Sequence, residues 1–232
     1  MKRFWKEARV TAEDGGWTVL LDSRPVRTPA KRACVVPVRA MADAIAQEWA
    51  AQEDEVIPLS MPMTRAAATC LDRVAPEMPA VRRIVADYGG TDLLCYRAEY
   101  PQALTERQRL GWDPLLDWAA EALGARLALG QGVMHVAQDA AALAALDRSV
   151  DALDPWALTC LSEMVTISGS LVLGLAVGQG HLTADEAWAL SRIDEQWNID
   201  EWGEDAEAAR QAAKREADFL HAAKVWAMVR ET

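Results

Sequence analysis

The chain has 232 residues, 51% apolar and 25% charged, which is enough for one large domain or two small ones with a real core. Its formal net charge of −11 disfavours non-specific attraction to nucleic acid or to an anionic membrane over most of the surface. The four cysteines lie far apart, with no CxxC pair and no secretory segment ahead of them. We therefore expect reduced, buried thiols in a cytosol-like compartment.

The first forty residues show the alternation of strands. Apolar side chains recur at alternate positions of 17–21, and the turn signal at 14–16 precedes them, which predicts a hairpin. A second turn at 22–25 leads on to the apolar run 35–38. Because that run contains Pro37, which cannot donate to a strand ladder, we expect a third strand at the edge of a sheet.

Helical spacing follows the strands. Met41, Ile45 and Trp49 recur on one face of the first helix, and further helices are predicted near 63–75 and 79–88. We assign Trp49 a structural role, because truncating a tryptophan in a core costs about 3–5 kcal/mol.

A short extended segment is expected at 93–96, and nearly all of the chain after Pro101 reads as helix. The predicted helices are 102–123, 138–150, 154–167, 169–179, 183–202 and 204–230. The apolar period changes from 2 to 3.6 with no alternation of strand and helix, which indicates an α+β protein. We expect a small N-terminal domain of hairpin sheet plus helix at 1–78, and a larger all-helical C-terminal domain at 79–232.

The most apolar stretch lies between Glu163 and Asp185, which have no charged residue between them. Glycines interrupt this stretch, whereas a spanning helix needs about 20 consecutive apolar residues. We therefore expect a buried pair of central helices and no membrane insertion.

The most distinctive segment runs from Thr183 to Phe219, where tryptophans alternate with acids. Residues 183–218 carry eleven acids against four bases. If 183–202 is one helix, Glu195 lies on the same stripe as Trp188 and Trp202. A carboxylate between two indoles lies either at the rim of the core or where a partner's cation can reach it.

Signatures of catalysis and of cofactor binding are missing from the sequence. No glycine-rich loop ends in Gly-Lys-Ser or Gly-Lys-Thr, no histidine has a metal-ligand neighbour at helical spacing, and no serine or cysteine lies in a nucleophile motif. Carboxylates are plentiful at 195–207, but acids near a helix start are favoured by the helix dipole and need no catalytic explanation. We predict no catalytic residue, no cofactor and no metal site.

Seven fragments carry a family resemblance, in one order along nearly the whole chain. They are RPVRTPA at 24–30, EWAAQ at 48–52, MPMTR at 61–65, TDLLCYRA at 91–98, WDPLLDW at 112–118, GSLVLGLA at 169–176 and DEQWNIDEWGEDAEA at 194–208. On these fragments the chain resembles the chaperones that assemble the soluble catalytic sector of the F-type ATP synthase, in the branch devoted to the alpha subunit.

The resemblance implies an ATP-independent chaperone that is a monomer when free. Members of this family hold the new alpha subunit by its apolar inter-subunit interface until the beta subunit replaces them. The chain would act in a bacterial cytoplasm, or in the mitochondrial matrix as a mature eukaryotic form. Matching positions in the acidic region make these residues the expected partner-binding set: Glu195, Trp202, Glu204, Asp205 and Glu207.

Two other functions stay open at the level of sequence. An enzyme of unknown class could use the carboxylates at 195–207, and it would need a pocket with perturbed acids. A structural subunit could be retained in a finished complex. A chaperone instead needs an exposed surface that is both apolar and acidic.

Overall fold

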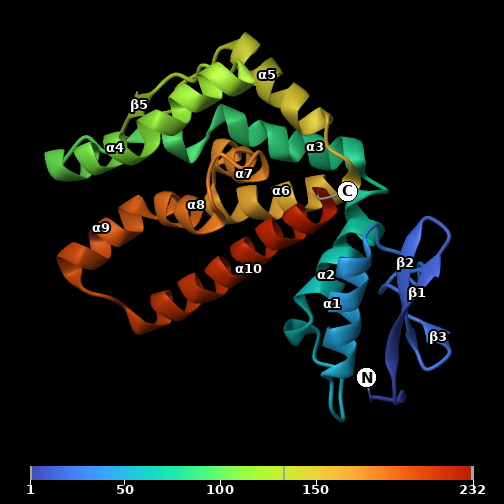
Figure 1. Ribbon diagram of the computed structural model, residues 1–232. Coiled ribbons are helices and arrows are strands. Elements are labelled where there is room, and N and C mark those ends of the chain that lie inside the picture. The colour runs from blue at the N-terminus through green and yellow to red at the C-terminus, as the bar shows by residue number, and fades with distance from the viewer. Residues whose placement is uncertain (1, 133, 231–232) are drawn as a thin grey trace. The chain divides into compact units, whose positions relative to one another are not determined.

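The computed structural model of the chain describes residues 2–132 and 134–230, and by the density of its contacts the chain divides into two units (Figure 1). The first unit takes the described parts of 1–78, 154–160 and 224–232, and the second takes 79–153 and 161–223. A small sheet near the N-terminus is followed almost entirely by helices, so the predicted α+β class is confirmed. That 1–78 and 79–232 are separate folding domains stays a prediction.

The sheet of the first unit has three antiparallel strands in the order β1 (Ala8–Glu13), β2 (Gly16–Leu21) and β3 (Arg24–Pro25). The predicted hairpin is confirmed as β1 and β2, with Val10 opposite Val19. Its turn needs glycine, because a Cβ atom on Gly16 would collide with the carbonyl oxygen of Val36.

The prediction of a third strand at 35–38 was wrong. This run forms only an isolated bridge, in which Val36 pairs with Trp17. Pro37 has no N–H with which to extend the pairing. The edge beside β2 is taken instead by Arg24 and Pro25, which the sequence had suggested as part of a turn.

Helix α1 (Arg39–Ala50) packs on β1 and β2. Met41, Ile45 and Trp49 are all buried, which confirms the predicted face, and the Trp49 ring meets Trp5 edge-on with centroids 5.2 Å apart. The carboxylate of Glu48 accepts hydrogen bonds from backbone N–H groups at the start of the next helix. These contacts fix the path of the chain through η1 (Pro58–Ser60) into α2 (Pro62–Thr69) and η2 (Cys70–Val74).

Replacing Trp49 by arginine should destabilise the first unit. The side chain is 8% exposed, so the substitution removes a core indole and places a charge in the core. We expect urea denaturation to show a loss of at least about 3 kcal/mol in the free energy of unfolding, together with a lower soluble yield. Trp49→Phe, the matched control, should lose clearly less. An arginine variant that unfolds at the wild-type urea concentration would contradict a structural role.

The second unit is built mainly from helices, and its elements follow η2 along the chain. They are α3 (Met78–Asp87), η3 (Tyr88–Gly90), η4 (Leu93–Cys95), β4 (Tyr96–Arg97), α4 (Gln102–Trp118), η5 (Ala119–Leu123), β5 (Gly130–Gln131), α5 (Ala140–Asp151), α6 (Pro155–Ser168), α7 (Leu171–Gly178), α8 (Ala184–Ser191), α9 (Ile193–Trp202) and α10 (Ala206–Arg230). Helices α6 and α10 each contribute residues to both units. Strands β4 and β5 form a short parallel pair that the sequence did not suggest.

Helix α7 is the centre of the second unit, because Leu171 to Ala176 are all buried. Gly174 lets α6 approach α7, since a Cβ atom there would lie 2.8 Å from the Leu161 side chain. This close approach confirms the expected buried pair of central helices. In the described parts of the chain, 2–132 and 134–230, no helix is both long enough and apolar enough to cross a bilayer.

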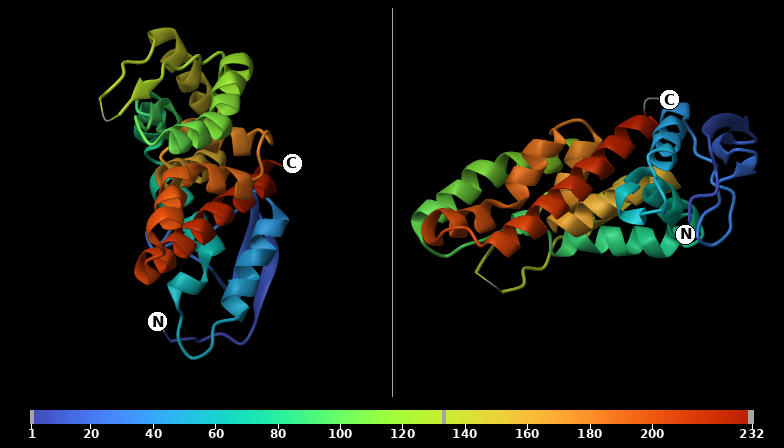
Figure 2. Two further views of the ribbon diagram at one scale, coloured as in Figure 1. Left: turned by 90° about the vertical axis from the view of Figure 1, so that its left-hand side faces the viewer. Right: turned by 90° about the horizontal axis from the view of Figure 1, so that it is seen from below.

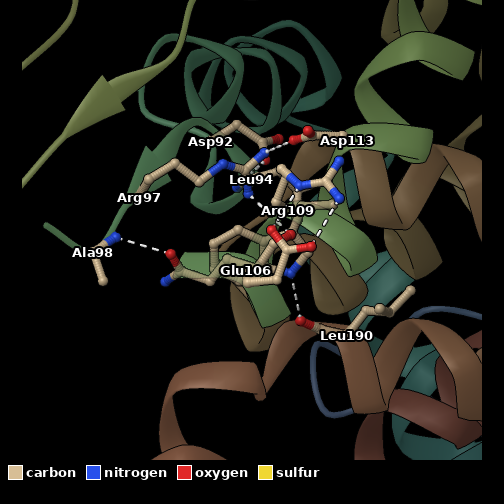
Figure 3. A network of polar contacts seen from close by, with 10 residues as sticks. Asp92, Leu94, Arg97, Ala98, Glu106, Arg109, Asp113 and Leu190 are labelled. Carbon is tan, nitrogen blue, oxygen red and sulfur yellow. Dashed lines mark hydrogen bonds and ion pairs between the residues drawn. The ribbon is translucent and has the colours of Figure 1, made fainter. Parts of the chain in front are cut away.

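A buried carboxylate ties the start of α7 to a segment eighty residues earlier. Asp92 is 0% exposed, and one of its oxygens accepts a 3.0 Å hydrogen bond from the N–H of Leu94 (Figure 3). Its other oxygen accepts a 3.0 Å hydrogen bond from the N–H of Val172. Burial raises the pKa of this carboxyl group, and its hydrogen-bond donors oppose that rise. Because Asp92 caps a helical turn at 93–95, the predicted extended segment at 93–96 was wrong, and only Tyr96 and Arg97 are extended.

Removing the Asp92 carboxylate should unfold the second unit more easily. In Asp92→Ala two backbone N–H groups stay buried without an acceptor, at about 1–3 kcal/mol each. We expect urea denaturation to show a loss of about 2–5 kcal/mol in the free energy of unfolding. Asp117→Ala, which removes an exposed aspartate from α4, is the control and should change stability by no more than about 0.5 kcal/mol. Equal stability of the two variants would show that the Asp92 contacts are dispensable.

Candidate partner-binding site

The segment from 183 to 202 is two helices, so the prediction of one continuous helix was wrong. A capping box starts α8, where the Thr183 hydroxyl accepts from the N–H of Glu186 and the Glu186 carboxylate accepts from the N–H of Thr183. Arg192 then leaves helical geometry, with φ −116° and ψ 19°. The Ser191 hydroxyl donates to the carbonyl of Trp188 at 2.7 Å, and such side-chain bonds compete with the helical ladder.

One side of α9 is occupied by α4. Arg107 pairs with Asp200 at 2.8 Å and lies over the Trp197 ring, while the Gln108 amide donates to Asp194 at 2.6 Å. Hydrogen bonds from Gln196 and Arg107 lower the pKa of the Asp200 carboxyl group, so this acid stays ionised. The contacts fix α9 in place within the second unit.

The other side of α9 faces α10, and the link at 203–205 joins the two helices (Figures 1 and 2). Side chains of both helices line a groove between them. We call this the α9–α10 groove; it consists of two adjoining hollows. Its apolar lining residues are Trp188, Ala189, Ile199, Trp202, Ala208, Ala209, Ala212 and Ala213. The α10 wall is made largely of alanines, which present only methyl groups toward α9 and so leave the space between the helices unfilled.

Glu195 bridges the two sides of the groove. Its carboxylate lies 3.3 Å from Arg192 and 3.7 Å from Arg215 of α10, and Arg215 also donates to the carbonyl of Ile167 at 2.7 Å. The Glu195 side chain is 47% exposed. Its charge is therefore already balanced by two cations of its own chain, where the sequence had left open a place at the rim of the core or a cation from a partner.

Trp202 ends α9 and is 86% exposed, the highest exposure among the large apolar side chains of the described residues. Gly203 follows with φ 88° and ψ 165°, a conformation that essentially only glycine adopts. Asp205 then starts α10, because its carboxylate accepts hydrogen bonds from the N–H groups of Glu207 and Ala208. The link thus turns the chain sharply and leaves the indole in solvent.

The structure gathers four of the five expected partner-binding residues at the groove. Glu195, Trp202 and Asp205 line one hollow, and Glu204 lines the adjoining one together with Asp205. Glu207 lines neither and lies in the first turn of α10, where the helix dipole favours an acid. Whether any of the five contacts a partner stays a prediction.

Sequence reasoning missed the two arginines of the groove and its alanine wall. The spacing of Arg192 and Glu195, three residues apart, could have indicated their ion pair. No local signal could have indicated Arg215, which lies twenty residues beyond Glu195. In the sequence the alanines indicate only a strong tendency to form helix, which says nothing of a groove wall.

The described residues offer little for catalysis. Among them, no group of three or more His, Cys, Asp or Glu side chains is arranged to hold a metal ion. All four cysteines are buried, and burial raises the pKa of Cys34 to about 11 and that of Cys70 and Cys95 to about 12. Thiols with such pKa values are poor nucleophiles at neutral pH.

A side chain at position 203 should strain the link that shapes the groove. A Cβ atom on Gly203 meets nothing within 4 Å, so the cost of Gly203→Ala is conformational and amounts to about 1–3 kcal/mol. We expect urea denaturation to show that loss in the free energy of unfolding. Gly90→Ala is the matched control, because Gly90 has equally open space but no positive φ, and it should change stability little. Equal behaviour of the two variants would show that the link is not held in its observed conformation.

Comparison with known proteins identifies relatives over the whole chain. The family model described as ATP12 chaperone protein matches residues 2–120. The chain is similar to the crystal structure of Atp12 from Paracoccus denitrificans, with 48% identity, a TM-score of 0.95 and coverage of 99% of this chain and 98% of that one. It is also similar to a putative chaperone from Agrobacterium tumefaciens, with 44% identity, a TM-score of 0.94 and coverage of 99% and 86%. A mitochondrial atp12 protein of Schizosaccharomyces pombe is 25% identical over 216 residues, which are 87% of this chain and 74% of that protein.

Proposed function

Because the chain belongs to the ATP12 chaperone family, we propose that it assists assembly of the F-type ATP synthase by binding the unassembled alpha subunit of the catalytic sector. It covers the apolar surface through which the alpha subunit will contact the beta subunit. It does so without ATP, cofactor or metal, and it leaves when the beta subunit arrives. The place of action is a bacterial cytoplasm, or the mitochondrial matrix for a mature eukaryotic form.

One observation carries the proposal for where the client binds. Trp202 holds an indole 86% exposed at the end of an apolar groove whose link and rim are acidic. Exposed tryptophans of this kind are frequent energetic centres of protein interfaces. The five acidic and aromatic residues Glu195, Trp202, Glu204, Asp205 and Glu207 are therefore the proposed partner-binding set.

Release by exchange agrees with the sequence. A ring subunit exposes an interface that is more apolar than ordinary surface, and it aggregates if that interface stays uncovered. Since the sequence offers no nucleotide-binding loop, no nucleotide cycle drives release. The affinity must instead come from a few anchoring side chains, so that the beta subunit can outcompete the chaperone.

The contacts at 195–207 argue against the alternative of an acid–base enzyme. Asp200 is held ionised by Gln196 and Arg107, and Glu195 lies between two arginines. A general acid would instead need a carboxyl group with a raised pKa in a water-excluding cleft. Both of these acids are exposed.

Co-expression with the cognate alpha subunit tests the function. We expect the two proteins to elute together from size-exclusion chromatography as a soluble one-to-one complex, measured by light scattering. Added beta subunit should dissociate this complex. If the alpha subunit aggregates as it does alone, the proposed function is wrong. If the complex persists through assembly and the protein is found in the finished synthase, it is a retained subunit.

Glu195→Lys should abolish capture of the alpha subunit while the fold stays intact. The substitution places a third cation beside Arg192 and Arg215, which repel it and alter the groove. Because the Glu195 carboxylate is exposed, losing its ion pairs should cost no more than about 1 kcal/mol of stability. We expect at least a tenfold loss of captured alpha subunit with unchanged circular dichroism. Glu121→Lys, at an exposed acid of η5, is the control and should capture normally; equal capture by both variants would remove Glu195 from the site.

A further inference from the structure

We infer that the α9–α10 groove accepts a short amphipathic helix of the client, with an apolar stripe along one face and a lysine or arginine near each end. The client itself is the one named in the proposed function, on which this inference rests. What is new is the kind of segment that enters the groove and how the groove selects it.

The groove lacks the side chains that would close it. In the described chain, α9 packs against α4, and on its other side the Glu195–Arg215 ion pair links it to α10. Ala208 and Ala212, one helical turn apart, both line the space on the α10 side, with Ile199 opposite. Small residues on one wall let a third helix approach, and its own side chains then fill the space. This is the arrangement in which proteins bind an amphipathic helix in a groove.

The length of the groove limits the length of its occupant. On α10 the lining residues run from Asp205 to Glu216. At 1.5 Å per residue this is roughly 17 Å, or about three turns of an α-helix. A helix of about 12 residues therefore spans it, with apolar residues at intervals of three and four facing the alanines and Ile199.

The charges of the groove favour a basic occupant. Its two bases, Arg192 and Arg215, are both engaged by Glu195. Glu204 at one end and Glu216 toward the other have no ion pair among the described residues. A cation near each end of the bound helix would meet one of these acids, while an acidic helix would be repelled.

Trp202 completes the site. It lines the groove beside Gly203 and is 86% exposed, so an arriving helix can bury most of the indole. Tryptophan offers a large apolar area with little conformational entropy to lose. Glu195 acts in this arrangement as a positioning residue, because it engages Arg192 and Arg215 and keeps them from opposing a basic helix.

Synthetic helices test the inference directly. The probe is a fluorescein-labelled 14-residue peptide with leucines on one face and a lysine near each end, titrated with the full-length protein by fluorescence anisotropy. We expect it to bind at least tenfold tighter than the same peptide with glutamates for the lysines, and than a shuffled peptide of equal composition. Equal binding of the three peptides, or no binding of any, would overturn the inference.

Matched leucines on α10 locate the binding. Ala212→Leu fills the groove, whereas Ala217→Leu adds the same side chain at an exposed position of α10 outside the lining. Leucine keeps helix propensity close to that of alanine, so both variants should fold. We expect Ala212→Leu to lower the affinity for the lysine peptide at least tenfold and Ala217→Leu to leave this affinity unchanged. Glu204→Lys, which leaves the groove open, should weaken binding of the lysine peptide and not of the glutamate peptide. Equal affinities in all variants would show that the peptide binds elsewhere.

The same variants separate this inference from the proposed function. If Ala212→Leu still captures the alpha subunit as the wild type does, the groove is not the client site, although the chaperone function stands. If the lysine peptide binds in the groove but no alpha subunit is captured, the proposed function fails and the groove remains a helix site. A concentration-dependent dimer in light scattering that Ala212→Leu abolishes would make a second copy of this chain the occupant and overturn the inference.

Discussion

The carboxylate of Asp92 is the contact on which the second unit depends. It has no access to water, yet it joins the N–H groups of Leu94 and Val172, which are far apart in sequence. A buried carboxylate is costly unless its oxygens are fully used, so this one specifies where α7 begins as well as stabilising it. Helix α7 in turn packs against α4 and α8. The Asp92 contact thus helps to fix the position of the helices that carry the groove.

One face of α9 is held in place by contacts with α4, and its other face borders the open groove. The face toward α4 has an ion pair, a hydrogen-bonded amide and a stacked guanidinium. The face toward α10 has alanines across from it and one bridging carboxylate, Glu195. A chaperone needs this combination, because a surface that already packs well against its own chain has nothing left to offer a client.

Sequence patterns predicted elements whose cause is local. The hairpin follows from its turn residues, α1 from the spacing of Met41, Ile45 and Trp49, and the start of α8 from Thr183 and Glu186. Features caused by contacts distant in sequence were missed, such as the helical turn that Asp92 caps at 93–95. The acidic and aromatic residues of the site could be named in advance. Their arrangement could not, because it depends on a helix break at Arg192 and on Arg215 crossing from α10.

The exposed indole of Trp202 has a consequence for the solubility of the protein. Each free molecule exposes apolar surface at Trp202, and two such surfaces attract one another. The formal net charge of −11 acts against this, because like-charged molecules repel before the indoles can meet. The acidic composition thus serves the whole molecule as well as the groove. It lets a chaperone remain dispersed while the most exposed large apolar side chain of its described residues stays uncovered.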